Sequence, residues 1–184
     1  MNITVYCGAN SGNSEIYKKS AENFGNWIVK NNYSLIYGGG KSGLMGIIAD
    51  IVLKGGCKAV GVMPVFLKEK EAAHQSLTEF ITVNTMTERK KIMIERGEVY
   101  VALPGGPGTL EEISEVISWA KIGQNIKPCI LFNINGYYDN LKNMYDTMVV
   151  EGFLTEEDRK KILFSYDFDE IEKFISEYEI SKVK

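Results

Sequence analysis

Three short apolar segments of this chain are each followed at once by a glycine-containing loop and then by an amphipathic stretch. The segments and their loops are 3–7 with 8–12, 33–37 with 38–43, and 99–103 with 104–108. Short apolar runs that end at glycine are typical of buried strands, and strands that alternate with helices form parallel sheets covered on both faces. In such sheets the loops after the strands lie at one edge, where ligands bind. The pattern therefore predicts three glycine loops that meet at a ligand site.

The rest of the chain continues this alternation. Further strands are predicted at 59–63, 79–83, 128–132 and 164–167, and helices at 15–30, 44–54, 87–96, from 109 onward, 138–150 and 167–178. Asn13 or Ser14 should cap the first helix and Thr87 the third, whereas 64–78 should be irregular. With 184 residues, of which 45% are hydrophobic and 24% charged, the chain can bury one core. We expect one domain over residues 1–184, an α/β fold with a mainly parallel, doubly wound sheet and helices on both faces.

Composition excludes several classes of partner and site. The net charge of −3 argues against nucleic acid as the main partner, because phosphate backbones attract basic surfaces. Cys7, Cys57 and Cys129 are far apart and odd in number, so we expect reduced, buried thiols and neither a disulfide framework nor a zinc site. No basic-then-apolar leader and no membrane-spanning apolar run is recognisable. We therefore expect a soluble, cytoplasmic protein with no membrane partner.

The third glycine loop carries the strongest chemical signal. Gly105, Gly106 and Gly108 allow backbone N–H groups to approach a ligand closely, and a helix predicted to begin at Thr109 adds unpaired donors and the positive end of its dipole. This arrangement suits a phosphate, although the loop matches neither a P-loop nor G-x-G-x-x-G.

Two carboxylates, Glu111 and Glu112, stand in the first turn of that helix, where a simple anion site does not require them. One interpretation is that the ligand needs a negative charge beside its phosphate. The other is a capping box, in which Thr109 and Glu112 satisfy free N–H groups at the helix start. The local pattern leaves both open.

Basic residues stand at the unfavourable end of the predicted helix 87–96. Lys91 and Glu95 are spaced as a solvated i,i+4 pair. Arg89 and Lys90 follow a strand-to-helix loop and so belong to the ligand edge. Arg89 is the better candidate for a phosphate or carboxylate, because guanidinium offers two parallel donors.

Other conspicuous side chains receive no catalytic role. The single histidine, His74, lies in a polar, irregular segment and is expected at the surface, so neither a Ser-His-Asp set nor a histidine-rich metal site is predicted. Acid–base chemistry is left to carboxylates. Packing roles are predicted for Trp119, Tyr137, Tyr138, Met45, Met63 and Met93.

The sequence resembles the "lonely guy" family of nucleoside 5′-monophosphate phosphoribohydrolases, which are known for activating cytokinins. The resemblance rests on LPGGPGTLEE, preceded by YGGGKSGLMG and MTERKKIM and followed by SWAKIG and NGYYDNL, and it runs from CGANSG to EGFL. It implies a Rossmann-like fold, a dimer with sites near the interface, and no metal or other cofactor. WAKIGQN stands where WAQLGIH is common, and CGANSG where CGSSSG is common; both differences concern base preference more than the reaction.

By position, the resemblance assigns the catalytic pair to Arg89 and Glu112. It implies nucleotide contacts at Glu71, Lys90, Gly106, Gly108, Thr109 and Ser118, the last of which is threonine in many relatives. Relatives have also been labelled lysine decarboxylases. A pyridoxal enzyme needs a Schiff-base lysine and an acidic partner for the ring nitrogen, and no such set is recognisable.

The expected reaction is hydrolysis of the N-glycosidic bond of a purine nucleoside 5′-monophosphate, AMP or an N6-modified AMP. Glu112 would stabilise the oxocarbenium-like transition state and activate water. The turn from Gly105 to Thr109, beside Glu111 and with help from Gly39, Gly40 and Ser42, would hold the substrate at its 5′-phosphate. Arg89 would either hold the phosphate side or orient Glu112. The rival is a non-catalytic nucleotide carrier or sensor on the same fold.

Overall fold

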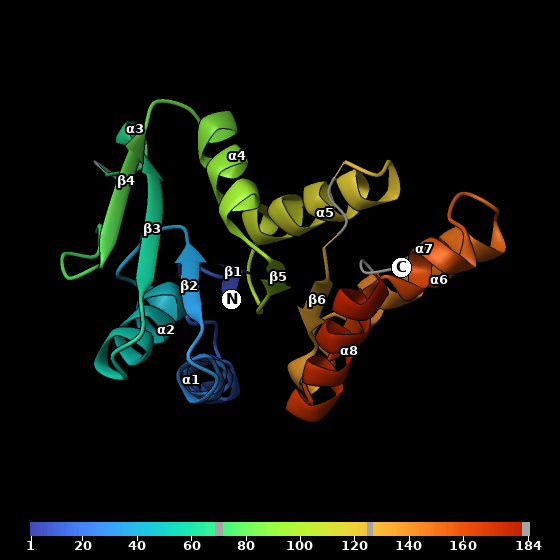
Figure 1. The fold of residues 1–184 in the computed structure, drawn as a ribbon, viewed down its shortest axis with the longest axis horizontal. Helices are drawn as coiled ribbons and strands as arrows, with labels where there is room; N and C mark the ends of the chain where they lie inside the picture. Colours follow the sequence, from blue (N-terminus) through green and yellow to red (C-terminus); the bar gives the residue numbers. More distant parts are fainter. Residues whose placement is uncertain (69–71, 125–126, 182–184) are drawn as a thin grey trace.

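The structure, a computed structural model, describes residues 1–68, 72–124 and 127–181, and it contains a parallel sheet of seven strands (Figure 1). The strand order is β4-β3-β2-β1-β5-β6-β7, and every neighbouring pair is parallel. The strands are β1 Asn2–Tyr6, β2 Ser34–Tyr37, β3 Ala59–Pro64, β4 Glu79–Val83, β5 Val99–Ala102, β6 Cys129–Phe132 and β7 Ile162–Ser165. The doubly wound parallel fold predicted from the sequence is confirmed.

Helices cover both faces of the sheet. They are α1 Glu15–Lys30, α2 Gly43–Lys54, α3 Val65–Lys68, α4 Met86–Arg96, α5 Pro107–Lys121, α6 Asp139–Val150, α7 Glu156–Lys160 and α8 Phe168–Ser181, with a short 3-10 turn η1 at Ile134–Gly136. Figure 1 shows α4 and α5 on one side of the sheet and α1, α2 and α8 on the other.

Alternating side chains of the central strand β1 belong to two hydrophobic cores, one on each face of the sheet. Ile3 and Val5 pack with the α1, α2 and α8 layer, whereas Tyr6 packs with the α4, α5 and α6 layer. Thr4 also faces the second layer, where its hydroxyl donates to the Met93 carbonyl (3.0 Å). This alternation follows from the two-residue period of a strand. The cores therefore fix β1 and β5 side by side, with Ile3 opposite Val99.

Two helices begin earlier than predicted, α5 by two residues and α4 by one. Helix α5 begins at Pro107, with Gly106 as N-cap, so Thr109 lies inside the first turn; of the two interpretations left open for Thr109 and Glu112, the capping box is therefore wrong. Proline fits the first helical position because its fixed φ suits the helix and its missing N–H costs nothing there. Helix α4 is capped by Thr85 rather than Thr87, and the Thr85 hydroxyl accepts from the Glu88 N–H (3.1 Å). At α1 the predicted cap, Ser14, is confirmed.

The segment predicted to be irregular contains α3 and a buried histidine. His74 is only 5% exposed, so its predicted surface location is wrong. Its Nε2 lies 2.9 Å from Asp50 Oδ1, and its Nδ1 accepts from the Ser76 N–H (3.2 Å), which assigns the proton to Nε2. The His74 N–H donates to the Gly39 carbonyl (3.0 Å). His74 therefore fastens its segment to the loop after β2.

Several smaller predictions can also be compared with the structure. The methionines Met45, Met63 and Met93 are buried, as predicted, and so is Tyr138. Trp119 and Tyr137 are 37% and 41% exposed, so neither belongs to the buried core, although the Tyr137 ring does pack against Tyr17 and Tyr138. All three cysteines are free thiols, but Cys57 is only partly buried. The last strand, β7, starts two residues before its predicted position. Of the helices in the described ranges, none has the length and apolar character needed to cross a bilayer.

Candidate active site

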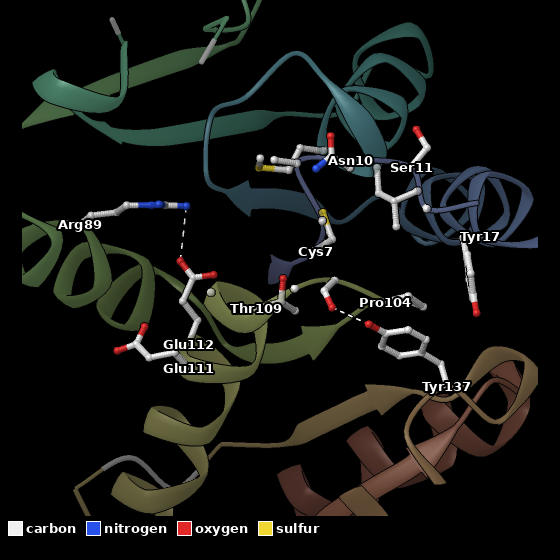
Figure 2. Close-up of a pocket in the computed structure, with 18 of the residues that line it drawn as sticks. Cys7, Asn10, Ser11, Tyr17, Arg89, Pro104, Thr109, Glu111, Glu112 and Tyr137 are labelled. Carbon is white, nitrogen blue, oxygen red and sulfur yellow. Dashed lines mark hydrogen bonds and ion pairs between the residues drawn. The ribbon is translucent and has the colours of Figure 1, made fainter. Parts of the chain in front are cut away.

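A cavity of about 400 Å³ opens at the carboxyl edge of the sheet, beside the neighbouring strands β1 and β5 (Figure 2). At this position the strand order reverses, since β2 to β4 extend from one side of β1 and β5 to β7 from the other. This switch point is where open α/β sheets bind ligands. The cavity is lined by Cys7, Gly8, Ala9, Asn10, Ser11, Gly12, Tyr17, Leu44, Met45, Met86, Arg89, Pro104, Gly105, Gly106, Gly108, Thr109, Glu111, Glu112 and Tyr137.

Hydrogen bonds join the three glycine loops in series. The Gly8 N–H donates to the Pro104 carbonyl (3.1 Å), and the Leu44 N–H donates to the Gly8 carbonyl (3.1 Å). The predicted meeting of the loops at one edge is therefore confirmed. The loop after β2 supports the loop after β1, whereas the loops after β1 and β5 face the cavity.

The three glycines at the start of α5 differ in why glycine stands there, because packing requires one of them and the other two leave space for a ligand. A Cβ at Gly105 would overlap the Thr109 hydroxyl, so Gly105 is required by packing. A Cβ at Gly106 or Gly108 would meet no atom within 4 Å, and neither residue has a positive φ. The fold does not require glycine at these two positions. Because both line the cavity, their missing side chains leave the helix start open to a ligand.

The start of α5 offers donors to that ligand. Its N-cap, Gly106, has no side chain to accept from the first-turn N–H groups. These groups have no carbonyl one turn earlier in the helix, and they lie at the positive end of its dipole. An anion such as phosphate matches both features.

Arg89 and Glu112 form a buried ion pair at the other side of the cavity. Arg89 Nη2 lies 3.3 Å from Glu112 Oε1, and the two residues are 9% and 7% exposed. Figure 2 shows the side chains pointing toward each other from α4 and α5. Neither Arg89 Nε nor Glu112 Oε1 has a hydrogen-bond partner among the residues that the structure describes. Buried polar atoms are costly unless they are hydrogen-bonded, so the ion pair leaves hydrogen-bonding capacity unused on both residues.

The surroundings of Glu112 bring the pKa of its carboxyl group close to neutral pH. Burial raises its pKa from 4.5 to about 7; the positive charge of Arg89 opposes this rise, and the negative charge of Glu111 adds to it. A carboxyl group with such a pKa can accept or donate a proton at physiological pH.

Arg89 fits this place because the loop after β2 has no side chain at position 38. A Cβ on Gly38 would overlap Arg89 Nη2 and press on the Met45 sulfur. On its other side Arg89 Nη1 donates to the Met86 sulfur (3.9 Å). The guanidinium is thus confined between α2, α4 and the loop.

Lys90 points to a neighbouring cluster rather than into the cavity. Its Nζ lies 2.5 Å from Glu111 Oε1 and 3.1 Å from Glu115 Oε2, and it joins α4 to α5. Hydrogen bonding to Glu111 raises the pKa of Lys90. Lys90 does not line the cavity, whereas Glu111 does. The structure therefore favours an indirect role for Lys90, in which it holds Glu111 at the rim.

Other predicted contacts lie outside the cavity lining. Gly39 packs close to Gly61 of β3, Gly40 pairs with Ala73, and Ser42 is the N-cap of α2. Ser118 lines a second cavity, of about 250 Å³, together with residues of α6 and α7. Glu71 lies outside the described residues.

Sequence reasoning missed some lining residues that the structure supplies. Tyr17 and Tyr137 form one aromatic wall, with ring centroids 5.6 Å apart, and Met86 lies beside Arg89. A signal for Tyr137 was present, because it follows β6 and the Asn135–Gly136 turn, on the edge that carries the glycine loops. Its aromatic type pointed to packing instead.

The fold and the site define a doubly wound α/β protein with an anion-binding helix start and a buried ion pair at the switch point of its sheet. Comparison with known proteins gives its family. A family model described as "Possible lysine decarboxylase" matches residues 45–174. The cytokinin riboside 5′-monophosphate phosphoribohydrolase LOG2 of Arabidopsis thaliana is 39% identical over 176 residues, 96% of this chain and 83% of that protein. The cytokinin riboside 5′-monophosphate phosphoribohydrolase of Rhodococcoides fascians is 42% identical over 168 residues, 91% and 85% of the two chains. The chain belongs to the family of these cytokinin riboside 5′-monophosphate phosphoribohydrolases, the same family that the sequence motifs indicated.

Solved structures support the fold at lower identity. The Moco carrier protein from Chlamydomonas reinhardtii superposes with a TM-score of 0.70 at 17% identity, covering 96% of this chain and 98% of the other. The molybdenum cofactor binding protein from Rippkaea orientalis gives a TM-score of 0.69 at 18% identity, covering 96% and 95%. At such identities the likeness concerns the fold alone.

The family description does not match the chemistry of the cavity. Pyridoxal-dependent decarboxylation needs a lysine that can reach the reacting group. The cavity lining, as far as the described ranges show it, includes no lysine. Its charged side chains are Arg89, Glu111 and Glu112, which suit a phosphorylated sugar with a developing positive charge.

Proposed function

We propose that this chain hydrolyses the N-glycosidic bond of purine nucleoside 5′-monophosphates, AMP or N6-modified AMP, and releases the free base and ribose 5-phosphate. One observation carries the proposal: a buried carboxyl group, Glu112, stands on the cavity wall one turn after the glycine turn, with its pKa near 7. The names of the relatives, which specify a phosphoribohydrolase acting on a riboside 5′-monophosphate, support the same reaction.

The geometry suggests how the reaction would proceed. The free N–H groups at the start of α5 bind the 5′-phosphate, which holds the sugar beside Glu112. As the C1′–N bond breaks, its electron pair leaves with the base, and positive charge develops on the sugar. The ionised Glu112 stabilises that charge and takes a proton from the water whose oxygen bonds to C1′, while the departing base nitrogen takes a proton from solvent.

Arg89 has two candidate roles, and the ion pair favours one of them. Its guanidinium lies 3.3 Å from Glu112 Oε1, and Gly38 and Met86 confine it. An arginine held in this way orients the carboxylate and opposes the rise of its pKa. We therefore propose that Arg89 orients Glu112 rather than binding the phosphate.

The rival function is a carrier that binds a nucleotide without cleaving it. A carrier gains nothing from a buried carboxylate with a pKa near 7 beside the sugar. Incubation with AMP followed by chromatography for adenine and ribose 5-phosphate separates the two. Release of both products in equal amounts, abolished in Glu112→Gln, supports hydrolysis. Unchanged AMP in the presence of tight binding supports the carrier.

We also propose a homodimer. Ser118 and Trp119 lie in the last turn of α5 and Ile122 is its C-cap, away from the cavity, and Trp119 and Ile122 are 37% and 66% exposed. A contact between Ser118 and substrate would have to come from a second copy of the chain. Sedimentation equilibrium tests the proposal: Ile122→Asp should yield monomers, whereas Val150→Asp, at an 83% exposed position on α6, should not.

A cytoplasmic location remains part of the proposal. The three free thiols fit a reducing compartment. The net charge of −3 fits a small-molecule substrate rather than nucleic acid.

A further inference from the structure

Three consecutive carbonyl groups in the turn before α5 accept hydrogen bonds from other parts of the chain. The Leu103 carbonyl accepts from the Tyr138 hydroxyl (2.8 Å), and the Gly105 carbonyl accepts from the Tyr137 hydroxyl (2.5 Å). The Pro104 carbonyl between them accepts from the Gly8 N–H (3.1 Å). Every carbonyl from 103 to 105 is therefore fixed in direction.

A fixed carbonyl also fixes the next N–H. The peptide group is planar and trans, so the C=O of one residue and the N–H of the next point in opposite directions. The Tyr137 hydroxyl, by holding the Gly105 carbonyl, directs the Gly106 N–H away from itself. The bond that it controls joins two glycines, the residue type with the widest choice of backbone conformations. Without a partner for the carbonyl, this peptide could turn over and present oxygen to an anion.

The Tyr138 hydroxyl has no such effect. The residue after Leu103 is Pro104, which has no N–H to direct. Tyr138 is buried, and its hydroxyl bond secures the end of β5. The adjacent tyrosines thus make similar bonds with different consequences, which provides a matched control.

Tyr137 is itself held in place although 41% of its surface is exposed. Its ring packs edge to face against Tyr17 and Tyr138, with centroid distances of 5.6 and 4.9 Å. The turn before it is closed by the Asn133 side chain, which accepts from the Tyr138 N–H (2.7 Å). Figure 2 shows the Tyr137 hydroxyl aimed at the glycine turn from the wall of the cavity. Phenylalanine would satisfy the ring packing equally well. What the hydroxyl adds is its hydrogen bond to the Gly105 carbonyl.

We propose that Tyr137 is a positioning residue that aims the Gly106 N–H at the phosphate of a bound sugar phosphate, acting through the Gly105 carbonyl. The proposal rests on the proposed function for the identity of the ligand, but not for the cleavage step. Its effect is on binding of the phosphate and only secondarily on the chemistry at Glu112.

The test compares Tyr137→Phe with Tyr138→Phe. Isothermal titration calorimetry with ribose 5-phosphate measures phosphate binding without turnover, and AMP kinetics separate KM from kcat. In Tyr137→Phe we expect the Kd for ribose 5-phosphate and the KM for AMP to rise about tenfold, the size expected from one hydrogen bond to a charged group. The kcat should change less than threefold. In Tyr138→Phe the Tm should fall, while the Kd for ribose 5-phosphate stays within twofold of wild type.

Two results with the variants would overturn the proposal. One is wild-type affinity for ribose 5-phosphate in Tyr137→Phe; the other is an equal loss of affinity in both variants, which would mean general loosening of the turn. Absence of ribose 5-phosphate binding by the wild-type chain would also overturn it. Absence of AMP cleavage with the expected binding pattern would instead reject the hydrolase function and leave the positioning role intact.

Discussion

Gly38 leaves the space that the Arg89 guanidinium occupies, although Gly38 lies in the loop after β2 and Arg89 lies on α4. Gly38 carries no charge and does not line the cavity, but its missing side chain decides where the partner of Glu112 can lie.

Gly38→Ala should therefore displace Arg89 without removing it. The φ of Gly38 is not positive, so alanine is tolerated by the backbone, and the strain falls on the guanidinium. A misplacement of about 1 Å near reacting groups can cost about 100-fold in rate. We expect kcat/KM for AMP to fall by about that factor while the far-UV circular dichroism spectrum is unchanged. Activity within threefold of wild type would show that the position of Arg89 is not critical.

Glu112→Gln should separate stability from turnover. Glutamine keeps the shape of the side chain but cannot take a proton from water, and a positioned general base contributes about 10²–10⁴-fold in rate. The variant should fold and bind AMP, yet release adenine at least about 100-fold more slowly. Glu111→Gln, at the cavity rim next to it, serves as control and should lose much less. Equal losses in the two variants would point to net charge rather than to a specific base.

The pH dependence should follow the raised pKa of Glu112, about 7. If Glu112 acts as base, kcat/KM should rise about tenfold per pH unit below pH 7 and level off above it. The rise of kcat/KM below pH 7 should be missing from the pH profile of the residual activity of Glu112→Gln. A wild-type profile that is flat between pH 5 and 8 would contradict the assignment.

The same pKa shift predicts a change in stability with pH. The folded chain keeps the Glu112 proton up to about pH 7, whereas the unfolded chain releases it near 4.5. The folded state thus binds more protons between these values, and the contribution to the free energy of unfolding is lost as the pH rises through 7. Urea denaturation of wild type and Glu112→Gln at pH 5 and pH 8 measures it: wild type should lose more stability than the variant over this interval.

Gly108→Ala should stabilise the chain and weaken its ligand. The new Cβ meets no atom, and replacing glycine by alanine at a compatible position adds about 0.4–1 kcal/mol of stability. Because Gly108 lines the cavity beside the helix start, we expect the Kd for ribose 5-phosphate to rise at least about tenfold. Gly105→Ala is the contrast, since its Cβ would overlap the Thr109 hydroxyl and should lower the Tm as well. Unaltered binding in Gly108→Ala would place the phosphate elsewhere.

The sequence predicted the layout of the edge because its signals are local. Apolar runs that end at glycine identify strands, and Arg89 and Glu112 each stand in the first turns of a helix that follows a strand. Position in a parallel fold then brings both to one edge. Positions along the chain were therefore enough to predict that Arg89 and Glu112 lie near each other, because loops that follow parallel strands share one edge of the sheet.

What the sequence could not predict depends on contacts between distant residues. Lys90 pairs with Glu111 and Glu115, which lie on another helix, 21 and 25 residues further along the chain. The sequence around Lys90 does not indicate these partners. His74 is buried because Asp50 and the Gly39 carbonyl meet it, although its own segment is polar. The start of α5 was misplaced because glycine and proline disfavour helix interiors but are acceptable at its first positions.

The pairing of β1 with β5 has a consequence for how the chain is made. Ile3 lies opposite Val99, so β1 leaves the ribosome about a hundred residues before the strand that covers its second edge. Until then the nascent sheet presents the open edge of a buried, apolar strand, a surface that favours wrong pairing. The cavity closes later still, when Tyr137 arrives. The strand at the centre of the finished site is thus the one most exposed during synthesis, and the one a chaperone has most reason to cover.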